Sequence, residues 1–289
     1  MEYLIHLGIL IAIYLILAQG FNLVFGLGQL FNLAHVATYA IGAYTTALLT
    51  VEYEWYVWTA LPASVLLGSV FSLLIGAISV RLSNDYFAIG TLAFSSVVTA
   101  VLINWRDVTR GVLGIPGIMR PRIGQYALDD NLPFFIFAAV ISSLVLILFF
   151  FLFNSSFARS LRAQAQFEPA AQSIGLYTAQ LRLIAFAIAS ATSALAGGLF
   201  AYYMSYIDPS SFMLNEMVLI LTICVAGGPG SFAGVCLSTF ALILLPESLR
   251  FCEFSPGILG PMRQLIYALI LFLVIYARRA RLFPVRRSI

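Results

Sequence analysis

Few side chains in this 289-residue sequence could take part in chemistry. Its two histidines, His6 and His35, are too few for a metal site, and no lysine occurs anywhere. The sequence has neither a GxSxG motif nor a phosphate-cradling glycine loop, and it cannot supply a Walker lysine. We therefore predict that the chain is not an enzyme, that it holds no metal and no cofactor, and that it does not itself hydrolyse ATP.

Polar side chains recur in one early apolar stretch, at Gln29, Asn32 and His35. If this stretch is helical, the spacing places the three side chains within about 60° of one face. Polar groups inside a membrane either hydrogen-bond to neighbouring helices or line a pathway, and both interpretations are open here. Together with Gly28, these residues form the first candidate pathway segment.

A second glycine-rich segment interrupts the longest apolar stretch, residues 215–246. This stretch is too long for one straight crossing of a hydrocarbon core about 30 Å thick, and its glycines and proline favour a helix break. Such a break persists in a membrane only where protein or a water-filled cavity satisfies the freed backbone groups. We predict a break at membrane depth beside a pathway, formed by Gly227, Gly228, Pro229, Gly230 and Ser231.

A polar, alanine-rich segment, residues 155–179, is expected to leave the membrane as a cytoplasmic loop. Residues 158–166 are good helix formers, Pro169 suits the first position of a new helix, and Gly175 can end that helix in the left-handed conformation. The pattern predicts two short helices joined by a turn. Such a knob is shaped either to dock into the groove of a partner or to rest on the lipid surface.

Membrane helices must position these segments, because the chain is 62% hydrophobic and only 9% charged. About a quarter of the residues of soluble proteins are charged. Each crossing takes about 20 apolar residues, and a helix satisfies its own backbone. We expect an all-α integral membrane protein, a polytopic bundle of about eight spans with broken or re-entrant segments, in one transmembrane domain over residues 1–289. The apolar runs lie near residues 3–25, 30–50, 57–80, 86–105, 132–154, 180–204, 215–246 and 264–280.

Charge placement predicts the topology. The net charge of +3 is too small to suggest nucleic-acid binding, and the positive-inside rule favours a cytoplasmic C-terminal tail. If the tail and the 155–179 loop both face the cytoplasm, the spans between them must be even in number. This requires either that residues 215–246 form a broken re-entrant pair that returns to its starting side, or that the span count differs. The predicted helix break favours the re-entrant pair. We place Glu216 and Glu247 at segment edges, so ion coupling has no obvious carrier. The tail arginines are Arg278, Arg279, Arg281, Arg286 and Arg287.

Ordered blocks of this sequence resemble the permease subunits of ABC importers for branched-chain amino acids, from about residue 20 to residue 250. In that resemblance, the family's glutamate-alanine-alanine loop, which forms the coupling helix moved by the ATPase, falls on Arg162, Glu168, Ala170, Ala171 and Gly175. The chain departs from the pattern where a charged run is expected, at residues 164–167, and where Pro169 replaces an aliphatic residue. The matching blocks are Gly28 to His35, Ile41 to Tyr44, Tyr86 to Phe94, Thr109 to Ile115, Arg162 to Gly175, Ala201 to Phe212, and Gly227 to Ser231 with Leu245 to Glu247.

The resemblance implies the transmembrane permease subunit of an ATP-driven importer for branched-chain or other neutral hydrophobic amino acids, with urea or short amides as the nearest alternatives. The implied partners are a sister permease, cytoplasmic ATP-binding subunits, an extracytoplasmic substrate-binding protein and the lipid bilayer. The implied location is the inner or plasma membrane of a bacterium or archaeon. A stand-alone channel would need no docking knob, and a membrane enzyme would need a polar catalytic cluster that the sequence lacks.

Overall fold

The computed structural model describes residues 2–82, 84–123, 126–250 and 256–282. Helices form nearly all of the described chain, as expected. Two short antiparallel pairs lie in the connections: β1 (Ile115–Pro116) with β4 (Tyr206–Ile207), and β2 (Arg122–Ile123) with β3 (Tyr126–Ala127). The helices are α1 (Glu2–Phe21), a π-helical turn η1 (Asn22–Leu27), α2 (His35–Val51), α3 (Val57–Arg81), α4 (Asn84–Asn104), α5 (Arg106–Thr109), α6 (Asn131–Asn154), α7 (Ser156–Gln166), α8 (Glu168–Ser173), α9 (Thr178–Met204), α10 (Leu214–Gly227), α11 (Phe232–Arg250) and α12 (Pro256–Leu282), with 3₁₀ turns η2 (Gly111–Leu113) and η3 (Pro209–Phe212).

Six of the described helical segments are long and apolar enough to cross a membrane. Two shorter apolar helices, Phe232–Leu245 and Gln264–Ala277, accompany them. The figure of about eight spans is therefore not established. The six segments are Glu2–Leu27, Val57–Ala77, Tyr86–Asn104, Asn131–Asn154, Thr178–Met204 and Pro209–Gly227.

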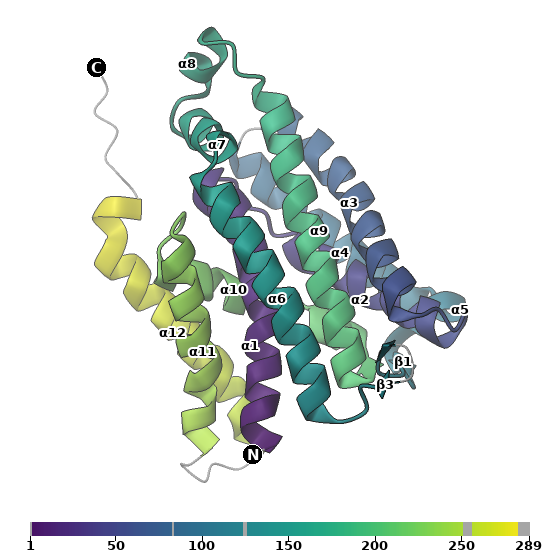
Figure 1. Cartoon of the computed structure of the whole chain (residues 1–289). Helices are drawn as coiled ribbons and strands as arrows, with labels where there is room; N and C mark the ends of the chain where they lie inside the picture. The colour runs from purple at the N-terminus through teal and green to yellow at the C-terminus, as the bar shows by residue number, and fades with distance from the viewer. Residues whose placement is uncertain (1, 83, 124–125, 251–255, 283–289) are drawn as a thin grey trace.

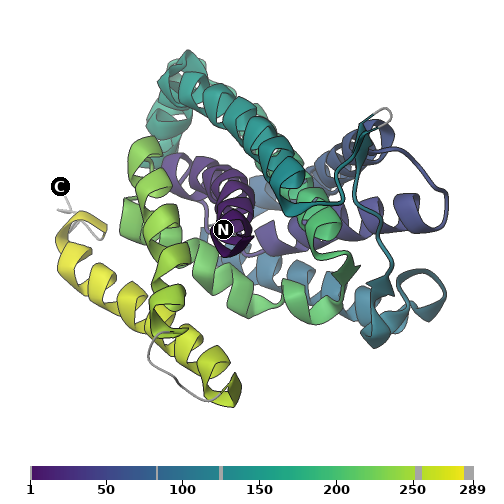
Figure 2. The same ribbon diagram turned by 60° about the horizontal axis from the view of Figure 1, so that its bottom comes forward.

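Helix α1 is the centre of the bundle, surrounded by α6, α9, α10 and α11 (Figure 2). Its side chains are apolar on all faces, which is the pattern of a helix buried on every side. Ile9, Ile13, Ile16 and Leu17 are accordingly fully buried. Helices α2 and α3 pack against α9, and α12 lies at the edge of the bundle against α10.

Helices α7 and α8 mark one end of the bundle, between α6 and α9 (Figure 1). Helix α10 runs toward this end, α11 returns to the other end, and α12 runs back and finishes at Leu282 on the α7–α8 side (Figure 1). The α10–α11 pair thus turns back toward the side from which it came, as predicted for residues 215–246. This return places the C-terminal end of α12 on the same side as the polar loop, in agreement with the charge pattern.

Candidate functional site

The polar loop forms the two short helices that the sequence predicts. The Ser155 side chain accepts a hydrogen bond from the Ala158 amide at 3.3 Å and caps α7. Phe167 is extended between the two helices, so α8 starts at Glu168, one residue before Pro169. Gly175 has a φ of 84° and ends α8 in the left-handed conformation. The hydrogen bonds from Gly175 to the Gln172 carbonyl and from Leu176 to the Ala171 carbonyl are those of a Schellman motif.

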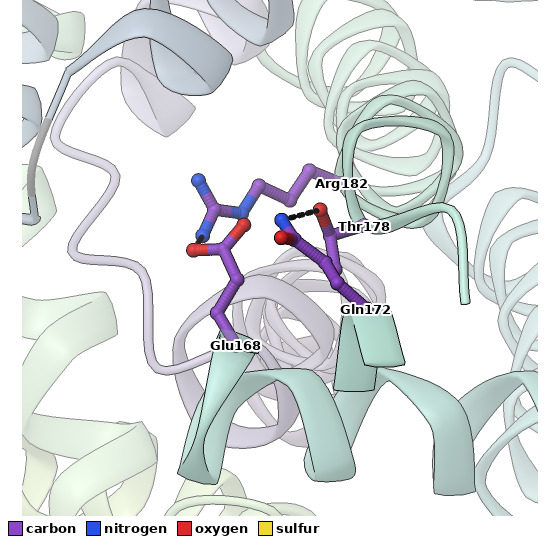
Figure 3. A network of polar contacts seen from close by, with 4 residues as sticks. All are labelled: Glu168, Gln172, Thr178 and Arg182. Carbon is purple, nitrogen blue, oxygen red and sulfur yellow. Dashed lines mark hydrogen bonds and ion pairs between the residues drawn. The ribbon is translucent and has the colours of Figure 1, made fainter. Parts of the chain in front are cut away.

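A polar network fixes this turn onto the start of α9 (Figure 3). The Glu168 carboxylate pairs with the Arg182 guanidinium at 2.5 Å, and the Gln172 amide donates to the Thr178 hydroxyl at 3.2 Å. The side chain of Arg182 is only 11% exposed, whereas that of Glu168 is 37% exposed. The buried Gln164 amide, oriented to satisfy both partners, donates to the Thr178 carbonyl and accepts from Arg182 Nε at 2.6 Å. The knob is therefore braced at several points.

The outer surface of the knob is mixed. Arg162, Ala170 and Gly175 are exposed, whereas Ala171 is buried against the rest of the chain. The predicted coupling residues thus divide into outward-facing ones and ones that hold the turn. Three large apolar side chains also face outward, namely Phe167, Ile174 and Tyr177. Arg182, which sequence reasoning missed, lies fourteen residues after Glu168, and no helical periodicity links the two.

The prediction that Gln29, Asn32 and His35 share a helix face is wrong, because α2 begins only at His35. Gln29 is exposed and left-handed, with a φ of 52°. The buried Asn32 side chain accepts a hydrogen bond from the Ala34 amide at 3.1 Å, and this turn competes with a helix. The Leu33 amide donates instead to the Thr91 hydroxyl at 3.1 Å.

His35 is a packing residue at the junction of three helices. Its buried Nε2 atom donates to the Leu17 carbonyl at 3.0 Å, and the Ser193 hydroxyl donates to the His35 carbonyl at 2.9 Å. The interhelical hydrogen-bonding interpretation therefore describes His35. Of the first candidate segment, only Gln29 points away from the described chain.

The second segment breaks at the predicted residues, and its position at membrane depth beside a pathway stays a prediction. Helix α10 ends at Gly227 and α11 begins at Phe232, while Gly228 and Gly230 have φ values of 92° and 80°. The break lies level with the last turn of α6, because the Phe232 ring packs against the rings of Phe150 and Phe153.

Two side-chain amides, Gln19 of α1 and Asn22 of η1, hydrogen-bond to backbone groups at the break. Asn22 accepts from the Gly230 amide at 2.8 Å and donates to the Ser231 carbonyl at 3.3 Å. Gln19 donates to the Phe232 carbonyl at 2.9 Å. Both side chains are fully buried, and sequence reasoning missed both. Their spacing of three residues in an otherwise apolar span was the available signal.

We expect Asn22→Leu to lower the stability of the folded chain by about 1–3 kcal/mol, because the Gly230 amide would lose its hydrogen-bond acceptor and the Ser231 carbonyl would keep only the bond from the Val235 amide. Thermal unfolding in detergent would measure the loss. Asn104→Leu is the matched control, because Asn104 is exposed and, among the described residues, its side chain bonds to Ala100 of its own helix. Equal melting temperatures for both variants would contradict this role of Asn22.

The two glycine interruptions meet in space. A Cβ atom on Gly26 would overlap the backbone nitrogen of Gly230 and lie 2.9 Å from its Cα atom. The contact is therefore backbone against backbone. Leu161 of α7 lies beside Gly28 at the end of the same turn, so the knob also rests on η1.

The prediction that Glu216 lies at a segment edge is wrong. It belongs to the first turn of α10, but this helix begins inside the bundle, and the Tyr14 hydroxyl of α1 donates to its carboxylate. Tyr14 is twelve residues beyond the start of α1 at Glu2, which is about 18 Å along the helix. Glu247 has a side chain outside the described set. Among the described residues, no three His, Cys, Asp or Glu side chains come together as metal ligands.

Comparison with known proteins identifies the family of this chain. Residues 3–275 match the family model described as the permease component of the branched-chain amino acid transport system. The chain is 34% identical to the high-affinity branched-chain amino acid transport system permease protein LivM of Escherichia coli, over 91% of this chain and 67% of that protein. It is 35% identical to LivM of Salmonella typhimurium, over 88% and 65% of the two chains.

A more distant relative is the probable branched-chain amino acid transport permease protein LivM of Methanocaldococcus jannaschii, at 26% identity over 76% of this chain and 67% of that protein. The chain thus spans about two thirds of the length of these relatives. No solved structure matches. With its apolar helices and its match over residues 3–275, this multi-pass membrane protein belongs to the family of branched-chain amino acid transport permease components.

Proposed function

We propose that this chain is the transmembrane permease subunit of an ATP-driven ABC importer that moves branched-chain or other neutral hydrophobic amino acids into the cell. A sister permease completes the pathway, cytoplasmic ATP-binding subunits dock on the α7–α8 knob, and an extracytoplasmic binding protein delivers the substrate. The membrane is the inner or plasma membrane of a bacterium or archaeon. This assignment extends what the family match and the relatives' names state.

The observation that carries the proposal is the braced knob. A flexible loop would absorb the motion of a partner, whereas a rigid element passes it on. The Glu168–Arg182 pair, the Gln172–Thr178 bond and the Schellman end at Gly175 hold α8 on α9. The exposed Phe167, Ile174 and Tyr177 supply an apolar docking surface on the same element.

Co-purification tests the proposal most directly. We expect this chain to bring down a Walker-motif ATPase encoded beside it, and we expect the purified chain alone to show no ATP hydrolysis. Reconstituted with its partners, it should take up leucine in an ATP-dependent way. Uptake of urea or short amides in place of leucine would change the substrate class, and ATP-independent flux through the chain alone would make it a channel.

We further propose that the pathway passes the two glycine interruptions, Gly28 with Gln29 and Gly227 to Ser231. Gln29 and Ser231 are both exposed in this chain. After replacement of Cys224, Cys236 and Cys252, single cysteines at positions 29 and 231 should react with water-soluble thiol reagents in the assembled importer. A cysteine at Thr222, which is fully buried in α10, should stay unlabelled. Protection of positions 29 and 231 would make the interruptions structural joints only.

A further inference from the structure

Helix α10 starts inside the bundle with its amino end uncapped. The residue before it, Met213, provides no side-chain cap for the first turn. The acid of the preceding loop, Asp208, is engaged elsewhere, because it accepts hydrogen bonds from Ser210 and Ser211 at 2.6 Å. Burial raises the pKa of Asp208, but these hydrogen bonds outweigh burial and hold its pKa below the usual range. The amino end of a half-helix at membrane depth carries partial positive charge and is suited to a carboxylate.

Buried phenols surround this helix end. The Tyr14 hydroxyl donates to the carboxylate of Glu216. Tyr39 of α2 packs its ring against Phe212, just before α10, at 5.1 Å between centroids. Its side chain is 1% exposed, it interacts electrostatically with Glu216, and its hydroxyl has no hydrogen-bond partner among the described residues. A buried hydroxyl without a partner is costly, so its position calls for a ligand group.

Access to the helix end lies on the outer side of its first turn. Met213, Leu214 and Asn215 are exposed, and Glu216 itself keeps partial exposure. Phe212 and Met217 line the inner side and are almost fully buried. A carboxyl group, a phenol hydroxyl without a described partner and the amino end of a helix thus lie near one another, beside an apolar wall.

We propose that the first turn of α10 is a transit site for the backbone of a zwitterionic amino acid. The Glu216 carboxylate accepts hydrogen bonds from the substrate ammonium. The Tyr39 hydroxyl and the positive amino end of α10 attract the substrate carboxylate, while Phe212 and Met217 contact its apolar side chain. This inference rests on the proposed transport function and adds the residues that recognise the substrate within the membrane.

Two variants test the site in the complete importer, reconstituted in proteoliposomes with its ATPase, sister permease and binding protein. Glu216→Gln removes the charge but keeps the size, and Tyr39→Phe removes only the hydroxyl. We expect either change to reduce leucine uptake about tenfold or more, since a hydrogen bond to a charged group is lost. ATPase stimulation by the leucine-loaded binding protein should stay within about twofold of the wild type, because docking and coupling use other surfaces.

Glu52→Gln is the matched control, because Glu52 is an exposed acid paired with Arg110 at the surface. It should leave leucine uptake unchanged. Wild-type uptake by both Glu216→Gln and Tyr39→Phe would overturn the transit site. Parallel losses of uptake and ATPase stimulation would overturn it as well, because they would show that the two residues serve only to hold the structure. If Glu216→Gln does not assemble, Tyr39→Phe alone decides between these outcomes. Failure of the wild-type importer to take up leucine would instead refute the proposed function.

Discussion

Replacing Glu168 with arginine is expected to reduce ATP-driven uptake by the proposed importer about tenfold or more, because two like charges would then face each other in the partly buried turn. In the native chain the Glu168 carboxylate lies 2.5 Å from the guanidinium of Arg182, which is 11% exposed. The introduced guanidinium would be repelled from α9, and α8 would lose its main brace. The membrane bundle should still assemble, since Glu168 lies outside the apolar core. Uptake, ATPase stimulation and subunit co-purification should be measured together.

A charge swap separates two roles of this residue. If Glu168 acts by holding the turn, adding Arg182→Glu to Glu168→Arg should restore most of the uptake. If Glu168 contacts the ATPase itself, the double variant should stay inactive. Glu52→Arg, which breaks the exposed pair with Arg110 at another surface, should leave ATPase co-purification intact. Wild-type uptake, stimulation and co-purification by Glu168→Arg alone would show that this loop is not the coupling element.

Gly26→Val is expected to destabilise the folded chain by about 3 kcal/mol or more, because overpacking at this position cannot be relieved by side-chain motion. The added atoms would overlap the backbone of Gly230, and Asn22 would be pushed from the hydrogen bond that holds the break. Loss of this contact would separate η1 from the α10–α11 pair. Thermal unfolding in detergent and the yield of monodisperse protein should both fall sharply.

Gly8→Ala is a suitable control for this substitution. The three atoms nearest to its added methyl all belong to the ring of Phe135, a side chain that can rotate. We expect a loss well below that of Gly26→Val, and the size of the difference measures the backbone contact. If Gly26→Val melts at the wild-type temperature, the two interruptions do not form the close contact described here.

Local chemistry allowed part of this architecture to be predicted from the sequence. Gly175 ends α8, and the Gly227 to Ser231 segment breaks the last long apolar run, because glycine and proline act on their own backbone. The turn at Asn32 is also formed by neighbouring residues, but the helix-like spacing of Gln29, Asn32 and His35 favoured a helix there instead. Since apolar residues fill both helical and extended membrane segments, the pattern did not show that α2 begins only at His35.

Long-range partners could not be predicted in the same way. Gln19 and Asn22 act on residues more than two hundred positions away, and Glu216 finds Tyr14 at a similar separation. Such pairings depend on how helices pack, which one sequence does not specify. The position of Glu216 within the bundle depends also on the loop before α10. Phe212 of this loop packs its ring against the rings of Tyr39 and Phe200.

The π-helical turn η1 has one wider consequence. A π-turn contains about one extra residue per turn, and here that turn touches both Leu161 of the knob and Gly230 of the break between α10 and α11. A displacement of α7 therefore reaches the break between α10 and α11 through η1. The route is short, because α7, η1 and the break all lie at one end of the bundle.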